Sequence, residues 1–286
     1  MTDPIVTTDP MVTTDWLAER LGAPDLVILD GSWHMPADNR DAKAEYAAGH
    51  IPGAAFFDID AIADHATDLP HMLPAPQAFA TAARRLGVEP GSTIVAYDSV
   101  GVFSAPRVWW SFRVMGHDKV FVLDGGLKKW LAEGRALEAG WREPAHGEFK
   151  AHPRPELIAD LAAVRRIVEA GGPQLVDARS AIRFRGEAPE PRPGLREGHM
   201  PGAHNVPWSS VLAADGTLAP PDILRAAFTA GGVGLAGPIV TTCGSGISAA
   251  ILALGLARLG REDVAVYDGS WSEWGSLPDT PVATGP

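Results

Sequence analysis

Short apolar runs alternate along this chain with longer segments whose apolar residues recur every three or four positions. In the C-terminal half, LVDA (175–178), PIVTTC (238–243) and VAVYD (264–268) are rich in β-branched residues and predict strands. DLAAVRRIVEA (160–170) and SAAILALGLARLG (248–260) have the apolar period of helices. Strands that alternate with helices indicate a parallel sheet covered by helices on both faces.

The chain contains the same pattern twice. Four blocks of the first half recur in the second half in the same order, about 144–149 residues apart: LVILD and QLVD, GHIPGA and GHMPGA, STIVAYDSVGVFSA and GPIVTTCGSGISAA, FVLDGGLKKW and AVYDGSWSEW. We therefore predict a duplicated α/β domain, with one copy over residues 12–142 and the other over 158–286. The segment between them, 143–157, is rich in proline and charge, and we predict that it is a linker.

Composition narrows the class of protein. The 286 residues are 46% hydrophobic and 21% charged, which is typical of a soluble protein with a substantial core. No apolar run approaches the ~18 residues that span a bilayer, and residues 1–16 lack the basic and apolar regions of a secretory signal. A single cysteine excludes an intramolecular disulfide, so we expect a cytoplasmic protein.

Charge and motif spacing argue against several partners and cofactors. The formal net charge of −11 makes nucleic acid and anionic membrane poor partners. The nine histidines show no metal-ligand spacing, and we expect no metal. GVGLAG (232–237) fits a dinucleotide fingerprint, but it precedes a strand instead of following one, so we expect no cofactor.

The only cysteine, Cys243, lies between the strand PIVTT and a helix that begins near Ile247. Open α/β sheets bind ligands at this end of their strands. Two glycines in CGSGIS (243–248) let backbone N–H groups converge, and the helix adds its positive end. Both effects favour a thiolate, the nucleophilic form. A lone cysteine is more often a small core residue, but the first copy has Asp98 in this place, and we expect Cys243 to be catalytic.

A second feature is the arginine-rich segment IRFRGEAPEPRPGLRE (182–197), which follows the strand LVDA. It carries Arg183, Arg185, Arg192 and Arg196. One interpretation is a guanidinium clamp for a carboxylate. The other is a solvated loop with ion pairs to Glu187, Glu190 and Glu197. Because the segment and Cys243 are both predicted at the carboxyl edge of the sheet, we favour the clamp.

Together these features resemble the tandem-domain rhodanese superfamily over nearly the whole chain. CGSGIS is similar to the loop of its 3-mercaptopyruvate sulfurtransferase branch, whereas thiosulfate sulfurtransferases carry Arg-Lys where this chain has Gly244-Ser245. RFRGEAPEPR (183–192) and FFDIDAIADHATDLPHMLP (56–74) also resemble the mercaptopyruvate branch. Ile247 and Ser248 depart from the usual valine and threonine, a change that should keep the shape of the loop.

The resemblance implies two rhodanese-like α/β domains, each a parallel sheet flanked by helices, with the site in the cleft between them. Cys243 would carry the sulfur, and the Ser245 hydroxyl would assist proton movement. Asp60 and His71 would reach in from the first domain as catalytic residues. The alternatives for this pair are a helix N-cap for the aspartate and simple packing for the histidine.

The resemblance also implies the substrate contacts. Arg183 and Arg192 would hold the carboxylate and carbonyl of the substrate. The remaining residues assigned to substrate binding lie in the loop itself: Gly244, Gly246, Ile247 and Ser248.

We therefore predict a 3-mercaptopyruvate sulfurtransferase. Cys243 takes sulfur from the donor, pyruvate leaves, and an external thiol such as thioredoxin, or cyanide, removes the sulfur from the persulfide. A thiosulfate sulfurtransferase and a non-catalytic rhodanese-like binding module are the alternatives. A cysteine-based phosphatase would need an arginine at the end of the loop, where Ala249 stands.

Overall fold

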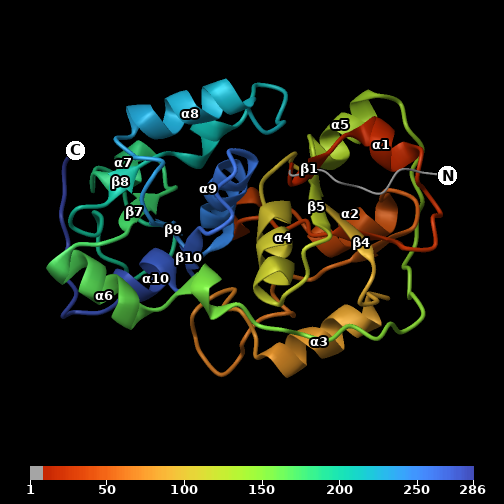
Figure 1. Ribbon diagram of the computed structural model, residues 1–286, viewed down its shortest axis with the longest axis horizontal. Coiled ribbons are helices and arrows are strands. Elements are labelled where there is room, and N and C mark those ends of the chain that lie inside the picture. The colour runs from red at the N-terminus through yellow and green to blue at the C-terminus, as the bar shows by residue number, and fades with distance from the viewer. Residues whose placement is uncertain (1–8) are drawn as a thin grey trace.

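The computed structural model describes residues 9–286 and contains two five-stranded sheets, one in each half of the chain. Every strand pair is parallel. Figure 1 shows the two halves side by side, with a pair of helices between the sheets. The expectation about a secretory signal rests on residues 1–16, and the first eight lie outside the described residues.

The first sheet has the strand order β1-β5-β4-β2-β3. Its strands are β1 (Met11–Val12), β2 (Leu26–Asp30), β3 (Ala54–Phe56), β4 (Thr93–Tyr97) and β5 (Val120–Leu123). The helices of this half are α1 (Thr14–Ala18), α2 (Ala42–Ala48), α3 (Pro76–Arg85), α4 (Ala105–Val114) and α5 (Gly126–Ala132). A short 3₁₀ turn, η1, covers Pro36–Asp38.

The second sheet repeats this order as β6-β10-β9-β7-β8. Its strands are β6 (Ile158–Ala159), β7 (Gln174–Asp177), β8 (His204–Asn205), β9 (Ile239–Thr242) and β10 (Ala265–Tyr267). The helices are α6 (Leu161–Ala170), α7 (Ala181–Phe184), α8 (Pro221–Ala230), α9 (Ile247–Arg258) and α10 (Ser270–Trp274), with 3₁₀ turns η2 (Pro155–Leu157) and η3 (Trp208–Val211). The matching order confirms the prediction of a duplicated α/β domain.

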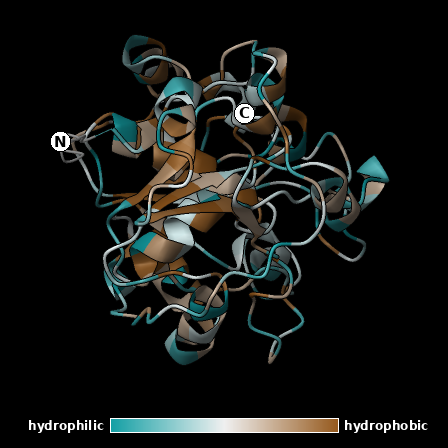
Figure 2. Cartoon of the chain, turned by 90° about the vertical axis from the view of Figure 1, so that its right-hand side faces the viewer, coloured by the Kyte–Doolittle hydropathy of each residue, from teal (hydrophilic) through white to brown (hydrophobic). Residues whose placement is uncertain are grey.

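Alternate residues of each strand face opposite sides of the sheet, so both faces are covered. In β4, Ile94 and Ala96 point into the core shared with α3 and α4, while Val95 and Tyr97 pack on the side of α1 and α5. Figure 2 shows the result as apolar strands in the interior, with hydrophilic residues on the outer helices and loops.

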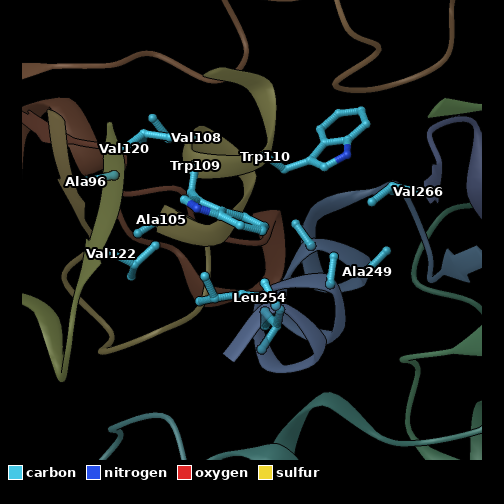
Figure 3. Packing of buried hydrophobic residues seen from close by; sticks show 14 of the residues in the cluster. Ala96, Ala105, Val108, Trp109, Trp110, Val120, Val122, Ala249, Leu254 and Val266 are labelled. Atoms are coloured by element: carbon cyan, nitrogen blue, oxygen red, sulfur yellow. The ribbon is translucent and has the colours of Figure 1, made fainter. Parts of the chain in front are cut away.

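The two halves share one continuous apolar core. Helices α4 and α9 cover the inner faces of the two sheets and pack against each other (Figure 1). Trp109 of α4 lies beside Leu254 of α9, and Trp110 extends toward Val266 of β10 (Figure 3). Burial of side chains this large contributes roughly 1.5–3 kcal/mol each. The mutual position of the two sheets is therefore set by packing, which matters for any site formed between them.

Chain segments between the two sheets run along the surface. The chain after α5 passes the end of α3, where Gly147 N–H bonds Arg84 O and Phe149 N–H bonds Val88 O. Within residues 9–286, no helix is long and apolar enough to cross a membrane.

Candidate active site

Cys243 begins the loop that connects β9 to α9, which we call the Cys243 loop (residues 243–248). The sequence predicted a strand over residues 238–243, whereas β9 ends one residue earlier, at Thr242. Gly246 adopts a left-handed φ of 81°, which turns its N–H back toward the cysteine. That N–H lies 3.2 Å from Cys243 Sγ. Cys243 is 2% exposed, and its sulfur lies at the N-terminal end of α9.

Residues at the start of α10 fix the backbone of the Cys243 loop. The N–H of Cys243 donates to Ser270 Oγ at 3.2 Å, and its carbonyl accepts the N–H of Trp271 at 3.0 Å. Ser272 donates to the Gly244 carbonyl through both its N–H and its hydroxyl. These bonds hold the nucleophile in one position before any substrate binds.

Asp60 and His71 of the first half lie next to each other at the interface between the halves. Asp60 Oδ1 is 2.9 Å from His71 Nδ1, and Asp60 Oδ2 accepts the indole N–H of Trp33 at 3.1 Å. The Trp33 ring also meets the imidazole edge-on, with 4.8 Å between ring centroids. Neither Asp60 nor His71 caps a helix, which removes the N-cap alternative for the aspartate.

The surroundings of His71 keep its imidazole neutral. Burial lowers the pKa of His71 more than the Asp60 carboxylate raises it, and the hydrogen bond to His71 lowers the pKa of Asp60. His71 Nε2 lies 3.3 Å from Arg192 Nη2. Because arginine only donates, Nε2 is the acceptor and the ring proton lies on Nδ1, toward Asp60. His71 therefore offers a lone pair toward the side of the site that holds Arg192.

Arg192 of segment 182–197 contacts His71 and interacts electrostatically with Cys243. Burial lowers the pKa of its guanidinium, and negative charge on Cys243 acts in the opposite direction. Among residues 9–286, Arg192 forms no ion pair with a carboxylate within 4 Å. A half-buried cation beside the nucleophile, without a carboxylate partner, can bind an anionic substrate.

Arg183 also contacts the Cys243 loop, and an ion pair fixes its guanidinium. It pairs with Glu190 at 2.5 Å, and Glu190 also accepts from the fully buried Arg179 at 2.7 Å. Arg179 in turn pairs with Asp177 at the end of β7. A Cβ atom built on Gly244 would lie 3.2 Å from Arg183 Nη2, so this guanidinium touches the loop backbone.

The other two arginines of the segment have structural roles. Arg185 pairs with the exposed Glu187, as the solvated-loop interpretation expected. Arg196 donates to the carbonyls of Trp274 and Thr280, which ties the segment to the C-terminal part of the chain. The clamp interpretation is thus limited to Arg183 and Arg192.

The remaining predicted residues differ in what their side chains can contact. Ser245 is 6% exposed and lies within the loop between Cys243 and the start of α9. Ile247 packs into the shared apolar core, so only its backbone is available to a substrate. Gly244 and Ser248 are half-buried.

Sequence reasoning missed Trp33 and Arg179 in this region, and it named Glu190 only as an ion-pair partner in the solvated-loop interpretation. Arg179 and Glu190 pair with each other. Trp33 follows β2, the strand equivalent to β7, and its position near the edge of the sheet was the available signal. The other two formed part of a charge-rich stretch whose pairing depends on how the loop folds.

Comparisons with known proteins agree with the duplicated fold. Residues 13–133 and 160–277 each match the model of the rhodanese-like domain. The 3-mercaptopyruvate sulfurtransferase of Escherichia coli K12 is 46% identical over 97% of this chain and 99% of its own length. The Arabidopsis thaliana protein named thiosulfate/3-mercaptopyruvate sulfurtransferase 1, mitochondrial, is 43% identical over 98% of this chain and 80% of its own. The crystal structure of SseA from Escherichia coli superposes with a TM-score of 0.85 at 43% identity, over 92% of this chain and 99% of that one.

Proposed function

The chain belongs to the rhodanese-like family, with two copies of its domain, and we propose that it is a 3-mercaptopyruvate sulfurtransferase working through Cys243. The observation that carries this proposal is the position of Cys243 Sγ. It accepts a backbone N–H of its own loop and lies in the electrostatic reach of Arg192, which also contacts His71 of the first domain. A nucleophile, a neutral base and an unpaired cation thus lie together.

The first half-reaction transfers sulfur to the enzyme. The Cys243 thiolate attacks the sulfur of 3-mercaptopyruvate, an S–S bond forms, and the C–S bond of the donor breaks. The electron pair of that bond leaves with the carbon as pyruvate enolate, which then takes a proton to become pyruvate. The donor's thiol hydrogen stays on the outer sulfur unless a base removes it. Cys243 is left as a persulfide.

The proposed roles of the side chains follow from this charge flow. Arg183 and Arg192 bind the carboxylate and carbonyl and stabilise the enolate charge. Ser245 and His71 move the proton, with Asp60 holding the imidazole in the tautomer that exposes Nε2. The N–H groups of Gly244, Gly246, Ile247 and Ser248 stabilise the anionic sulfur.

The second half-reaction returns the enzyme to its starting state. The thiolate of an acceptor attacks the outer sulfur, and Cys243 leaves as a thiolate. Because Cys243 is the only cysteine, the acceptor must be external, and we propose thioredoxin or a small thiol, with cyanide as an alternative. A single thiol is also typical of a reducing compartment, which supports a cytoplasmic location.

The two alternative functions are a thiosulfate sulfurtransferase and a non-catalytic binding module. A thiosulfate sulfurtransferase would use a compact dianion, and the Arabidopsis relative is named for both donors. Gly244 and Ser245 place no cation next to the nucleophile, which supports the mercaptopyruvate donor. A non-catalytic binding module would not need a buried thiol beside two arginines.

The domain limits remain part of the proposal: a domain without a nucleophile over 12–142, a linker over 143–157 and the catalytic domain over 158–286. The two family matches fall inside these domains and support the division.

The proposal is tested by mass spectrometry of the intact protein after incubation with 3-mercaptopyruvate. We expect one added sulfur atom on the peptide that contains Cys243, release of one pyruvate per sulfur, and loss of the added mass on treatment with cyanide or reduced thioredoxin. A protein that binds the donor but gains no sulfur would be the binding module instead.

A further inference from the structure

Behind the Cys243 loop, a buried ion pair joins the two domains. Arg107 of α4 in the first domain and Asp268, which follows β10 in the second, are 2% and 4% exposed. Arg107 Nη1 lies 2.5 Å from Asp268 Oδ1. The guanidinium also stacks 4.5 Å from the ring centroid of Trp110. Buried charges persist only where their remaining hydrogen-bonding groups are satisfied, so the other partners of this pair indicate what it does.

Both members of the pair also hold the segment that carries His71. Arg107 Nη2 donates to the His71 carbonyl, and Asp268 Oδ2 accepts the N–H of Leu73 at 2.7 Å. His71 has a left-handed φ of 60°, which is uncommon for residues other than glycine. Such a conformation persists when surrounding contacts fix it. The ion pair supplies two such contacts, one at the His71 carbonyl and one at the N–H of Leu73.

The same pair packs against the nucleophile loop. A Cβ atom built on Gly246 would lie 2.8 Å from Arg107 Nη1 and 3.0 Å from the Asp268 carbonyl oxygen. Gly246 is the residue whose N–H points at Cys243 Sγ. The ion pair therefore touches both parts of the site, the loop from the second domain and the histidine segment from the first.

The internal repeat provides a control for this arrangement. The gap-free alignment of 92–105 with 237–250 continues along the following helices and places Leu252 at the position of Arg107. In the same numbering offset, Leu73 matches Leu218 and His71 matches Gly216. The arginine is thus present in the copy that has a histidine to hold, and a leucine stands in the copy that has none.

We propose that Arg107 is a positioning residue for sulfur transfer, which acts with Asp268 to hold the His71 imidazole in place relative to the Cys243 loop. The first domain would then contribute to the reaction through an interdomain ion pair as well as through His71 itself. This inference rests on the proposed function, because it assigns His71 a part in the proton movement of that reaction.

The first test is Arg107→Lys, which keeps the charge but lacks the planar fork that reaches Asp268 and the His71 carbonyl together. A displacement of about 1 Å in a catalytic group lowers the rate by roughly 100-fold. We expect kcat for pyruvate release to fall roughly 10- to 100-fold, with KM changed less than about threefold because Arg183 and Arg192 remain. Wild-type kcat in a folded Arg107→Lys protein would overturn the proposal.

A double-mutant cycle with His71→Ala separates positioning from general structural damage. If Arg107 acts through the imidazole, Arg107→Lys should change the single-turnover rate of persulfide formation by less than about twofold once His71 is alanine. An equal loss in both backgrounds would show that the arginine supports the fold or the loop, and the proposal would be wrong.

Two further variants control for folding and for the type of contact. Arg107→Met/Asp268→Asn removes both charges while leaving an acceptor for Leu73 N–H, and it replaces Arg107→Lys if that protein melts below the assay temperature. The same kcat loss and the same dependence on His71 are expected. Arg258→Lys is the matched control, because Arg258 of α9 donates to the Leu218 carbonyl, the counterpart region of the other copy. It should leave kcat unchanged, and a loss equal to that of Arg107→Lys would contradict a role specific to His71.

These results are distinct from a failure of the proposed function. If the wild-type protein itself gains no sulfur from 3-mercaptopyruvate, the function is wrong, and with it the role of Arg107 in sulfur transfer. If the wild type works and the cycle is additive, only the role of Arg107 is wrong.

Discussion

The Cys243 loop has a counterpart in the first domain, which we call the Asp98 loop (residues 98–103). The two loops occupy equivalent places in the fold, but one begins with a cysteine and the other with an aspartate. Each follows a central strand and leads into an inner helix, α4 or α9. In the Asp98 loop, the carboxylate itself accepts backbone N–H groups at 2.8–3.0 Å, from Val100, Gly101, Phe103, Ser104 and Ala105. The loop is an anion site that its own side chain fills.

The two loops also differ in the segment that the opposite domain places beside each of them. Asp268 accepts the N–H of Leu73, and its counterpart Asp124 accepts the N–H of Leu218 at 2.8 Å. At the Cys243 loop this segment brings His71, whereas at the Asp98 loop it brings Gly216, whose carbonyl would meet a Cβ on Gly101 at 2.8 Å. The fold supplies two similar anion sites, and a few side chains decide which of them can carry out chemistry.

The strongest test of this comparison is Cys243→Ser. A hydroxyl cannot form a persulfide and the change is nearly isosteric, so sulfur transfer should be abolished while the fold is kept. Intact-protein mass spectrometry after incubation with the donor should show no added sulfur. Turnover retained in this variant would rule out the proposed mechanism.

A second test of this comparison moves the thiol from the Cys243 loop to the Asp98 loop. In the Cys243→Ser background, Asp98→Cys places a thiol among N–H donors but leaves it without the histidine and the two arginines. We expect no restoration of sulfur transfer in a protein that folds. Restored activity would mean that the loop backbone alone suffices for the reaction.

The next largest effect is expected from Arg183 and Arg192 beside the Cys243 loop, whereas the arginine beside the Asp98 loop, Arg40, donates to Ser99 and pairs with Glu45. Loss of a charge-assisted hydrogen bond typically removes roughly 1.5–3 kcal/mol, so Arg192→Ala should lower kcat/KM about tenfold to over a hundredfold. Arg183→Ala should lower kcat/KM by a similar factor. Glu190 stays paired with Arg179, so the surrounding fold should be kept. Lysine should restore activity only in part, because it lacks the planar fork.

Steady-state kinetics with 3-mercaptopyruvate checks both variants, with Arg185→Ala as the control on the same segment. Arg185 pairs with an exposed glutamate and should be dispensable. If Arg183→Ala and Arg192→Ala both kept the wild-type kcat/KM, segment 182–197 would be an ordinary surface loop and not a clamp for the substrate.

The fold and the position of Cys243 at the end of a central strand could be predicted from sequence because both depend on local signals. Strand β9, the glycines after Cys243 and helix α9 are contiguous, and the internal repeat fixed the duplicated architecture. The structure also brings together the pair Asp60 and His71, which only a family resemblance indicated, since nothing in their local sequence separates them from a cap or a packed side chain.

Contacts that cross the interface could not be predicted. Arg107 is one of two arginines in the helix α4, and its partner Asp268 lies 161 residues further along the chain. Such contacts depend on the packing of α4 against α9, which carries no local signal in either helix.

A smaller effect concerns which donor the Cys243 loop accepts. Thiosulfate is a compact dianion, and the neutral pair Gly244-Ser245 gives it no adjacent cation. We expect the wild type to prefer 3-mercaptopyruvate, and Gly244→Arg/Ser245→Lys to shift the ratio of kcat/KM toward thiosulfate by roughly tenfold, equivalent to about 1.4 kcal/mol. The new arginine would meet Arg183, which lies 3.2 Å from a Cβ at position 244, so absolute activity with mercaptopyruvate should fall.

The measurement is kcat/KM for both donors on both proteins at one pH and ionic strength. Ser245→Ala alone is the control for loss of the hydroxyl. A wild type that favours thiosulfate would show that the branch assignment is wrong.

The smallest effect on activity is expected at the Asp98 loop. Asp98 is fully buried, and Asp98→Asn would turn an amide NH₂ toward N–H groups that now share one carboxylate oxygen, those of Phe103, Ser104 and Ala105. Each unsatisfied buried donor costs about 1–3 kcal/mol, so we expect the free energy of unfolding to fall by roughly 3 kcal/mol. Thermal melts should show a Tm lower by roughly 6–12 °C.

Turnover per folded molecule should nevertheless stay within about twofold of the wild type, because the Asp98 loop holds an anion for stability and has no donor-binding arginines around it. Activity measured well below the lowered Tm separates the two effects. If a folded Asp98→Asn protein lost turnover, the aspartate would be acting on the reaction across the α4–α9 interface. The division between a loop that fills its own anion site and a loop that leaves the site for sulfur would then be wrong.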